Sequence, residues 1–196
     1  MPVTKGTALD PARTREAILA AATELLYRRG LDGVGVAELC AAVGASKETL
    51  YRHFGSKDGL IQAVLEARSD RVHAWISTAV ATAPDPAAEL HAVFEALGGW
   101  FEQPEFRGCA IVNAATQRHS PPARLVAVRH LDRYLEMFTD IAARAGVAEP
   151  GELGGQLLIL LEGATVVADH HRADGVARLA GRAALTLLHA TEKSQP

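Results

Sequence analysis

The sequence predicts an all-α protein with an N-terminal head of three helices and a larger C-terminal helical body, about nine helices in all. No segment alternates apolar and polar residues over more than a few positions, so strand signals are nearly absent. Apolar residues instead recur at helical spacing, and Ser, Asp, Pro and Gly mark the ends of most of these stretches. At 196 residues, 48% of them hydrophobic, the chain can bury a sizeable core.

Local chemistry places the helices one by one. Asp10-Pro11 begins the first helix, and Gly30 ends it after a basic last turn. Gly44 ends a short second helix, Ser46 caps a third, and Gly55-Ser56 separates the third from a long fourth. Proline and glycine divide the rest of the chain in the same way. The expected helices span residues 11–29, 36–43, 47–54, 57–82, 86–102, 107–118, 121–146, 152–172 and 175–190.

Charge and composition indicate two domains in a reducing compartment. Residues 1–57 carry a net charge of +2 and residues 58–196 a net charge of −5, and we take these two ranges as the head and the body. Cys40 and Cys109 do not make a disulfide framework, which favours the cytoplasm. We find no leader peptide and no apolar run of the roughly 18 residues that a membrane span needs. The sequence therefore predicts a cytoplasmic protein without a membrane partner.

The second and third helices form a helix-turn-helix pattern. Two short helices joined at Gly44 can cross steeply and pack Leu39 against Leu50. The third helix then presents a polar surface, and a helix is the right width for the major groove of DNA. From spacing alone, any small helical hairpin could show this pattern. The polar residues are Ser46, Lys47, Glu48, Thr49, Arg52 and His53.

Residues 13–60 resemble the DNA-binding head of the TetR family of bacterial transcriptional regulators. The stretch Ser46–Leu60 carries the most recognisable part of this resemblance, and Gly30, Glu38-Leu39 and Gly44 also match. The resemblance implies a connecting fourth helix, a body that binds a ligand and dimerises, and a contact from the Tyr51 hydroxyl to phosphate. Lys57 lies in the first turn of the fourth helix, where a cation opposes the helix dipole unless phosphate approaches the same helix end. The residues expected to bind DNA are Ser46, Lys47, Glu48, Thr49, Tyr51, Arg52, His53 and Lys57.

Three residues depart from the family pattern. Val34 and Gly35 stand where the family usually has Thr and Ser, and Ala37 replaces a residue that is often polar. Without the hydroxyl that the family has just before the second helix, this helix loses a side-chain cap and a phosphate contact. We therefore expect greater reliance on Tyr51, Lys57 and the arm around Arg13 and Arg15. The same departures leave an alternative open, a helical ligand-binding protein of this fold that does not bind DNA.

An enzyme is not expected. Cys109 lies beside an apolar run without a visible histidine partner, which favours a structural thiol. His170 and His171 are adjacent on a helix, so their side chains point ~100° apart and do not readily share a metal ion. No Gly-rich phosphate loop is present. The sequence thus predicts no catalytic residues, no metal site and no cofactor.

The body is expected to bind a second copy of the chain and a small-molecule effector. Small and apolar residues on the last two helices suit a two-fold interface, although a helix pair buried within a monomer would also account for them. The predicted interface residues are Leu157, Leu161, Thr165, Ala168, Ala180, Ala184 and Leu187. The predicted ligand-binding residues are Phe94, Phe101, Asn113, Gln117, Tyr134, Phe138 and Glu162. Since no basic residue clearly points inward among them, the ligand is expected to be largely hydrophobic, and neutral or cationic.

These expectations together describe a homodimeric, ligand-responsive regulator. It would be a repressor that binds a palindromic operator in double-stranded DNA and releases it when the small molecule binds.

Overall fold

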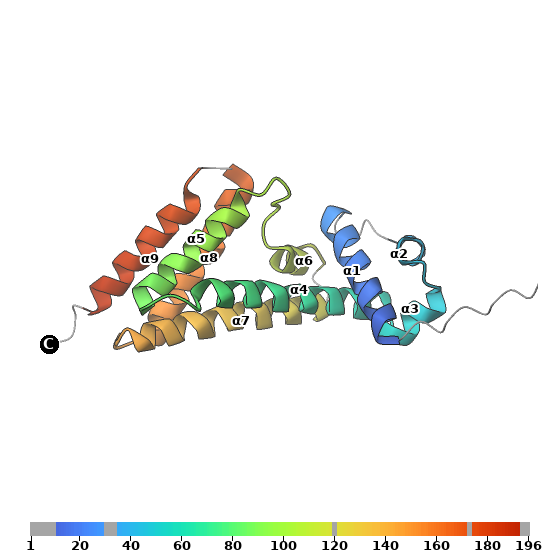
Figure 1. Cartoon of the computed structure of the whole chain (residues 1–196), viewed down its shortest axis with the longest axis horizontal. Helices are drawn as coiled ribbons and strands as arrows, with labels where there is room; N and C mark the ends of the chain where they lie inside the picture. Colours follow the sequence, from blue (N-terminus) through green and yellow to red (C-terminus); the bar gives the residue numbers. More distant parts are fainter. Residues whose placement is uncertain (1–10, 30–34, 119–120, 172–173, 193–196) are drawn as a thin grey trace, which may run out of the picture.

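The computed structural model describes residues 11–29, 35–118, 121–171 and 174–192. Within these ranges the chain forms nine α-helices and no strand, which confirms the predicted fold class (Figure 1). The helices are α1 (Pro11–Arg29), α2 (Val36–Val43), α3 (Lys47–Phe54), α4 (Lys57–Val80), α5 (Pro86–Phe101), α6 (Ala110–Arg118), α7 (Pro121–Arg144), α8 (Pro150–His171) and α9 (Val176–Glu192).

Two long helices, α4 and α7, lie side by side and form the spine of the molecule (Figure 1). The head, α1 to α3, lies at one end of this spine and contacts α4 through α1 and α3. At the other end α5, α8 and α9 pack on one another, and α5 and α8 also pack on α7. Helix α4 runs from the head into the body and so connects the two.

The helix ends follow from local chemistry. Asp85 caps α5 by accepting a hydrogen bond from the Ala88 backbone N–H at 2.8 Å. Pro86 lies in the first turn, where a backbone N–H would have no acceptor within the helix, so its missing N–H costs no hydrogen bond. The helix start that differs most from the prediction is that of α6, which begins at Ala110 rather than at about residue 107. Gly108 has φ +71°, a left-handed conformation that keeps the preceding residues out of the helix.

Buried apolar side chains form two clusters. The first lies in the body between α4, α5, α7, α8 and α9, and Phe94, Phe138 and Leu157 are among its members. The second joins the head to the spine, since Ile18, Leu39 and Leu50 pack with side chains of α4, α6 and α7. The head therefore shares its core with the first half of α4, beyond the boundary drawn from sequence after residue 57.

Among the described residues, α8 is the one helix that is long and apolar enough to cross a membrane by length and composition. Leu153, Leu157 and Leu161 on its inner face are fully or almost fully buried in the body core. This packing accounts for the apolar composition of α8, as in the core helix of any globular protein.

Candidate nucleic-acid interface and body sites

The turn between α2 and α3 is built by backbone geometry. Gly44 ends α2 in the left-handed conformation, φ +65°, and its N–H donates to the Ala41 carbonyl. The Ala45 N–H donates to the Cys40 carbonyl at 3.0 Å, which closes the turn. Ser46 then caps α3 by accepting from the Thr49 N–H at 3.1 Å. These contacts fix the angle at which α3 leaves α2.

Helix α3 packs one face inward and presents the other to solvent. Leu50 is fully buried and Phe54 is buried against the head core, so both serve packing. Ser46, Lys47, Glu48, Tyr51 and Arg52 are exposed, and Tyr51 retains 40% of its accessible surface although it is a large aromatic residue. Thr49 and His53 are half-buried. The structure thus places all the predicted α3 residues on or beside one accessible surface.

The start of α4 adds a positive helix end beside this surface. Ser56 caps α4 by accepting from the Gly59 N–H at 2.9 Å, and Lys57 is the first residue of the helix. A Cβ at position 59 would collide with the Phe54 carbonyl oxygen, so glycine permits the close passage of α4 behind α3. A lysine opposes the helix dipole at this position, but it suits a helix end that meets phosphate.

Two of the departures from the family pattern have structural consequences. Gly35 is the N-cap residue of α2 and makes no side-chain cap hydrogen bond, as the sequence predicts. Ala37 is exposed and offers no polar group. The Arg15 guanidinium lies 5.4 Å from the centre of the Phe54 ring, in a cation–π contact that fixes it beside the end of α3. Val34 and the Arg13 side chain lie outside the described part of the chain.

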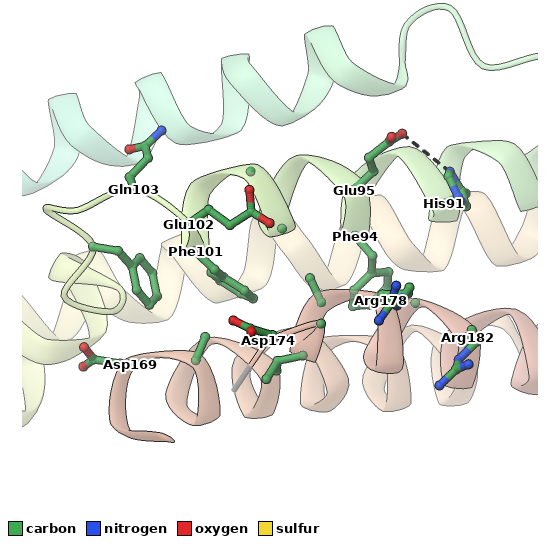
Figure 2. A pocket seen from close by; sticks show the side chains of 18 of the residues that line it. His91, Phe94, Glu95, Phe101, Glu102, Gln103, Asp169, Asp174, Arg178 and Arg182 are labelled. Atoms are coloured by element: carbon green, nitrogen blue, oxygen red, sulfur yellow. Dashed lines mark ion pairs between the residues drawn. The ribbon is translucent and has the colours of Figure 1, made fainter. Parts of the chain in front are cut away.

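A large groove lies between α5 and α9, and we call it the outer groove. Its volume is about 900 Å³, and Phe94 and Phe101 point from α5 toward α9 across it (Figure 2). Carboxylates and guanidiniums both line the groove. The charged lining residues include Glu95, Glu102, Arg107, Asp169, Asp174, Arg178 and Arg182.

A second hollow, the inner cavity, lies between α4, α5, α6, α7 and α8. Its volume is about 10 Å³, enough for about one water molecule. Tyr134 and Glu162 line it together with Trp100. Burial raises the pKa of the Glu162 carboxyl, and within the described ranges no hydrogen bond or ion pair engages this carboxylate.

The structure does not bring the seven predicted ligand residues into one pocket. Phe94 and Phe101 belong to the outer groove, whereas Tyr134 and Glu162 belong to the inner cavity. Phe138 is fully buried in the body core, Asn113 donates to the Arg107 carbonyl at 2.9 Å, and Gln117 is exposed. The periodicity of single helices could not tell which residues face the same hollow, and Gln117 does not face inward at all.

Three buried residues between the helices of the spine, Ser69, His73 and His130, form a polar cluster, and the half-buried Cys109 just before α6 adjoins it. Ser69 Oγ lies 2.9 Å and His73 Nε2 lies 3.0 Å from His130 Nδ1, and His73 Nε2 is also 3.1 Å from the His130 carbonyl oxygen. Because a carbonyl oxygen only accepts, His73 Nε2 carries a hydrogen and donates to the His130 carbonyl. The same N–H faces His130 Nδ1, so Nδ1 is an acceptor and the Ser69 hydroxyl donates to it. Both histidines are neutral in this arrangement.

Cys109 has a histidine neighbour that sequence reasoning missed. Its Sγ lies 3.7 Å from His130 Nε2, which is 21 residues away along the chain. Burial raises the pKa of the thiol to about 11 and lowers the pKa of His130 to about 3. The thiol stays protonated and the imidazole stays neutral, so this pair lacks the thiolate that a nucleophile needs.

The structure places six of the seven predicted interface residues in the core of the chain itself: Leu157, Leu161, Thr165, Ala168, Ala180 and Ala184. Leu187 is half-buried. A side chain buried within one chain offers a partner little surface, so exposed apolar residues of the same helices are the better candidates for an interface. The exposed large apolar residues of the same helices are Ile159, Val166 and Val167 on α8 and Leu179 on α9.

Comparison with known proteins supports this description of the head. The profile of bacterial regulatory proteins of the tetR family matches residues 18–64. The chain is 30% identical over 153 residues to the HTH-type transcriptional repressor BdcR of Escherichia coli, a match that covers 72% of this chain and 74% of BdcR. It is 34% identical over 98 residues to the HTH-type transcriptional activator FasR of Mycolicibacterium smegmatis, covering 50% of this chain but only 45% of FasR.

Solved structures extend the similarity over the whole chain. A putative TetR regulator from Streptomyces avermitilis aligns with a TM-score of 0.79 and 31% identity, covering 91% of this chain and 98% of the other. A TetR-family regulator from Streptomyces coelicolor aligns with a TM-score of 0.77 and 27% identity, covering 93% and 95%.

Fold, head and comparisons define a transcriptional regulator that binds DNA through a helix-turn-helix. The chain belongs to the TetR family. Its relatives regulate transcription and are not enzymes, in agreement with the sequence prediction.

Proposed function

We propose that this protein is a cytoplasmic, homodimeric repressor that binds a palindromic operator and is released by a small molecule. The observation that carries the proposal is the exposed polar surface of α3, held at the end of a helix that runs into the body. Two such heads, related by a two-fold axis, can enter successive major grooves on one side of a duplex. The α3 surface also favours this function over a ligand-binding protein without DNA affinity.

Release follows from the place of α4. Glu66 and Asp70 on α4 pair with Arg129 and Arg133 on α7, at 2.7 and 2.8 Å. A ligand that favours a different packing of the body shifts α4, and this changes the separation of the two heads. Ligand binding then weakens operator binding, and operator binding weakens ligand binding by the same factor. The difference in ligand affinity between the two arrangements of the body limits this factor.

Phosphate binding by the head is tested by changing Tyr51 and Lys57. We expect Lys57→Ala to weaken binding to all duplexes alike, and to reduce the slope of log K against log salt by about 0.9 per head, since one phosphate contact is lost. Tyr51→Phe should weaken binding about tenfold, because only the hydroxyl is removed. Fluorescence anisotropy over a range of salt concentrations measures both effects.

Arg71→Ala removes an exposed cation from the middle of α4, away from the head, and serves as the matched control. It should leave the salt slope unchanged. If the double variant Tyr51→Phe/Lys57→Ala binds duplex DNA as tightly as the wild type, the head does not bind DNA through this surface.

We place the effector in the outer groove. Its volume of about 900 Å³ suits a small molecule, whereas the inner cavity has room for about one water. The groove has an aromatic floor from Phe94 and Phe101, and its charged rim holds arginines as well as carboxylates (Figure 2). These arginines remove the reason for expecting only a neutral or cationic ligand.

A thermal-shift screen across a compound library tests this assignment. A compound that stabilises the wild type is expected to bind Phe101→Ala about tenfold more weakly, because the apolar contact with the ring is lost. Tyr134→Phe removes only a hydroxyl from the inner cavity and should leave the affinity unchanged. The opposite result, with Tyr134→Phe weakened and Phe101→Ala unaffected, would assign the effector to the inner cavity.

A further inference from the structure

Two charged side chains occupy the centre of the surface that α3 presents. Residues on a helix follow one another at about 100°, so the direction opposite the buried Leu50 falls between Glu48 and Arg52. Both side chains are exposed. Lys47 and Tyr51 lie to one side of this direction, and Lys57 lies on α4. A duplex that approaches α3 from the side opposite Leu50 therefore meets Glu48 and Arg52 first.

Hydrogen bonds orient Arg52 before any DNA arrives. Ser46 Oγ lies 2.9 Å from Thr49 Oγ1, and Arg52 Nη2 donates to the same Thr49 oxygen over a long contact of 3.4 Å. The chain Ser46–Thr49–Arg52 draws the guanidinium back along α3 toward the N-terminal end of the helix. That end carries the base contacts when a recognition helix enters the major groove. An oriented arginine also loses less side-chain freedom on binding.

The neighbourhood of Arg52 suits a base better than a phosphate. Glu48 lies one helical turn away on the same face, and its carboxylate repels phosphate. Tyr51 and Lys57 at the edge of the surface are better placed to hold the DNA backbone. A carboxylate in the major groove needs a donor, and the base edges provide donors only at the amino groups of cytosine and adenine.

We propose that Arg52 reads a guanine and Glu48 a cytosine in each half of the operator, an assignment that rests on the proposed binding of double-stranded DNA. Arginine can donate two parallel hydrogen bonds to guanine O6 and N7. Glu48 accepts from the cytosine N4 amino group. Adenine is a poorer partner for Glu48, because its N7 acceptor lies beside the amino group and faces the carboxylate.

Selection of bound sequences from random duplex DNA tests the assignment with the full-length protein. The wild type should select a palindrome. Each half should contain one guanine whose selection depends on Arg52 and one cytosine whose selection depends on Glu48. Arg52→Ala should lose the preference at the guanine, where the wild type discriminates about 5- to 150-fold against other bases, and keep the rest of the motif. Glu48→Gln should replace the cytosine by adenine, because an amide both accepts and donates.

Lys57→Ala is the matched control, since loss of a phosphate contact should weaken binding without changing the selected motif. Thr49→Val keeps the shape of the side chain but removes the oxygen that orients Arg52, and should narrow the discrimination at the guanine. An Arg52→Ala protein that selects the wild-type motif, more weakly at every position, would place Arg52 on phosphate and overturn the proposal. A wild-type protein that selects no motif would overturn the proposed function itself.

Discussion

A carboxylate on the outward face of α8 is expected to leave the protein folded but monomeric. Ile159 and Val166 lie about two turns apart on this face and expose 72% and 54% of their surface. In the proposed dimer these side chains are covered by the partner, and an unpaired carboxylate there costs several kcal/mol, of order 3–5. Ile159→Glu and Val166→Glu should therefore shift the equilibrium to monomers.

Loss of the dimer should also abolish operator binding at ordinary concentrations. When two heads are joined, the second half-site is bound intramolecularly, which raises affinity by about 10²- to 10⁴-fold. A monomer loses this gain although its α3 surface is intact. Equilibrium sedimentation measures the assembly, and anisotropy with a palindromic and a half-site duplex measures the effect on DNA binding.

Two control variants distinguish loss of this interface from a general effect of added charge and from unfolding of the body. Leu125 on α7 is 57% exposed, so Leu125→Glu places the same charge on another apolar surface position and should leave a dimer. Leu161 is buried in the body core, and Leu161→Glu should unfold the body instead of producing folded monomers. Persistent dimers in both α8 variants would move the interface to another surface.

Sequence reasoning succeeded where the structure depends on neighbouring residues. Helix ends are set by a cap or a glycine within a turn, which is why Ser46 and Gly44 marked their helices correctly. The inward face of α3 was equally clear, because Leu50 and Phe54 are the apolar residues of a short polar helix. The surface expected to meet DNA could therefore be identified residue by residue.

It failed where helices that are distant in sequence must be placed against one another. Helix α8 carries apolar residues on nearly every side, so periodicity could not separate the core residue Leu157 from the exposed Ile159. The contact of Cys109 with His130 depends on how α7 packs beside the start of α6. The same limit accounts for Phe101 and Glu162, both predicted ligand residues, which line different hollows.

Mild acid is expected to destabilise the protein through the polar cluster. Burial lowers the pKa of His73 to about 4 and that of His130 to about 3, from an ordinary value near 6.5. Below pH 6.5 the unfolded chain binds protons that the folded chain does not, so the free energy of unfolding falls as the pH falls. At pH 5 each histidine should lower it by about 2 kcal/mol. Total stability is commonly only about 5–15 kcal/mol, so the effect is large.

The groups around the two histidines act in different directions. Arg133 disfavours the charged form of both histidines, whereas Asp70 favours that of His73. Glu162 opposes the expected trend, because its pKa is raised and its ionisation in the folded protein lowers stability as the pH rises. The titratable or charged groups that act on the cluster or line the inner cavity beside it are Arg68, Asp70, Cys109, Arg133, Tyr134 and Glu162.

Urea unfolding at pH 7.5 and pH 5 measures the difference, and single substitutions assign it. His73→Gln and His130→Gln should each remove about half of the loss contributed by the histidines, since the amide does not titrate. Glu162→Gln should increase the loss on acidification by removing the opposing group. His91→Gln is the matched control, because His91 is an exposed histidine on α5, away from the cluster. Its Nδ1 lies 3.7 Å from the Glu95 carboxylate. A loss that persists unchanged in both cluster variants would mean that His73 and His130 titrate normally in the folded protein, and the neutral hydrogen-bonded pair described here would be wrong.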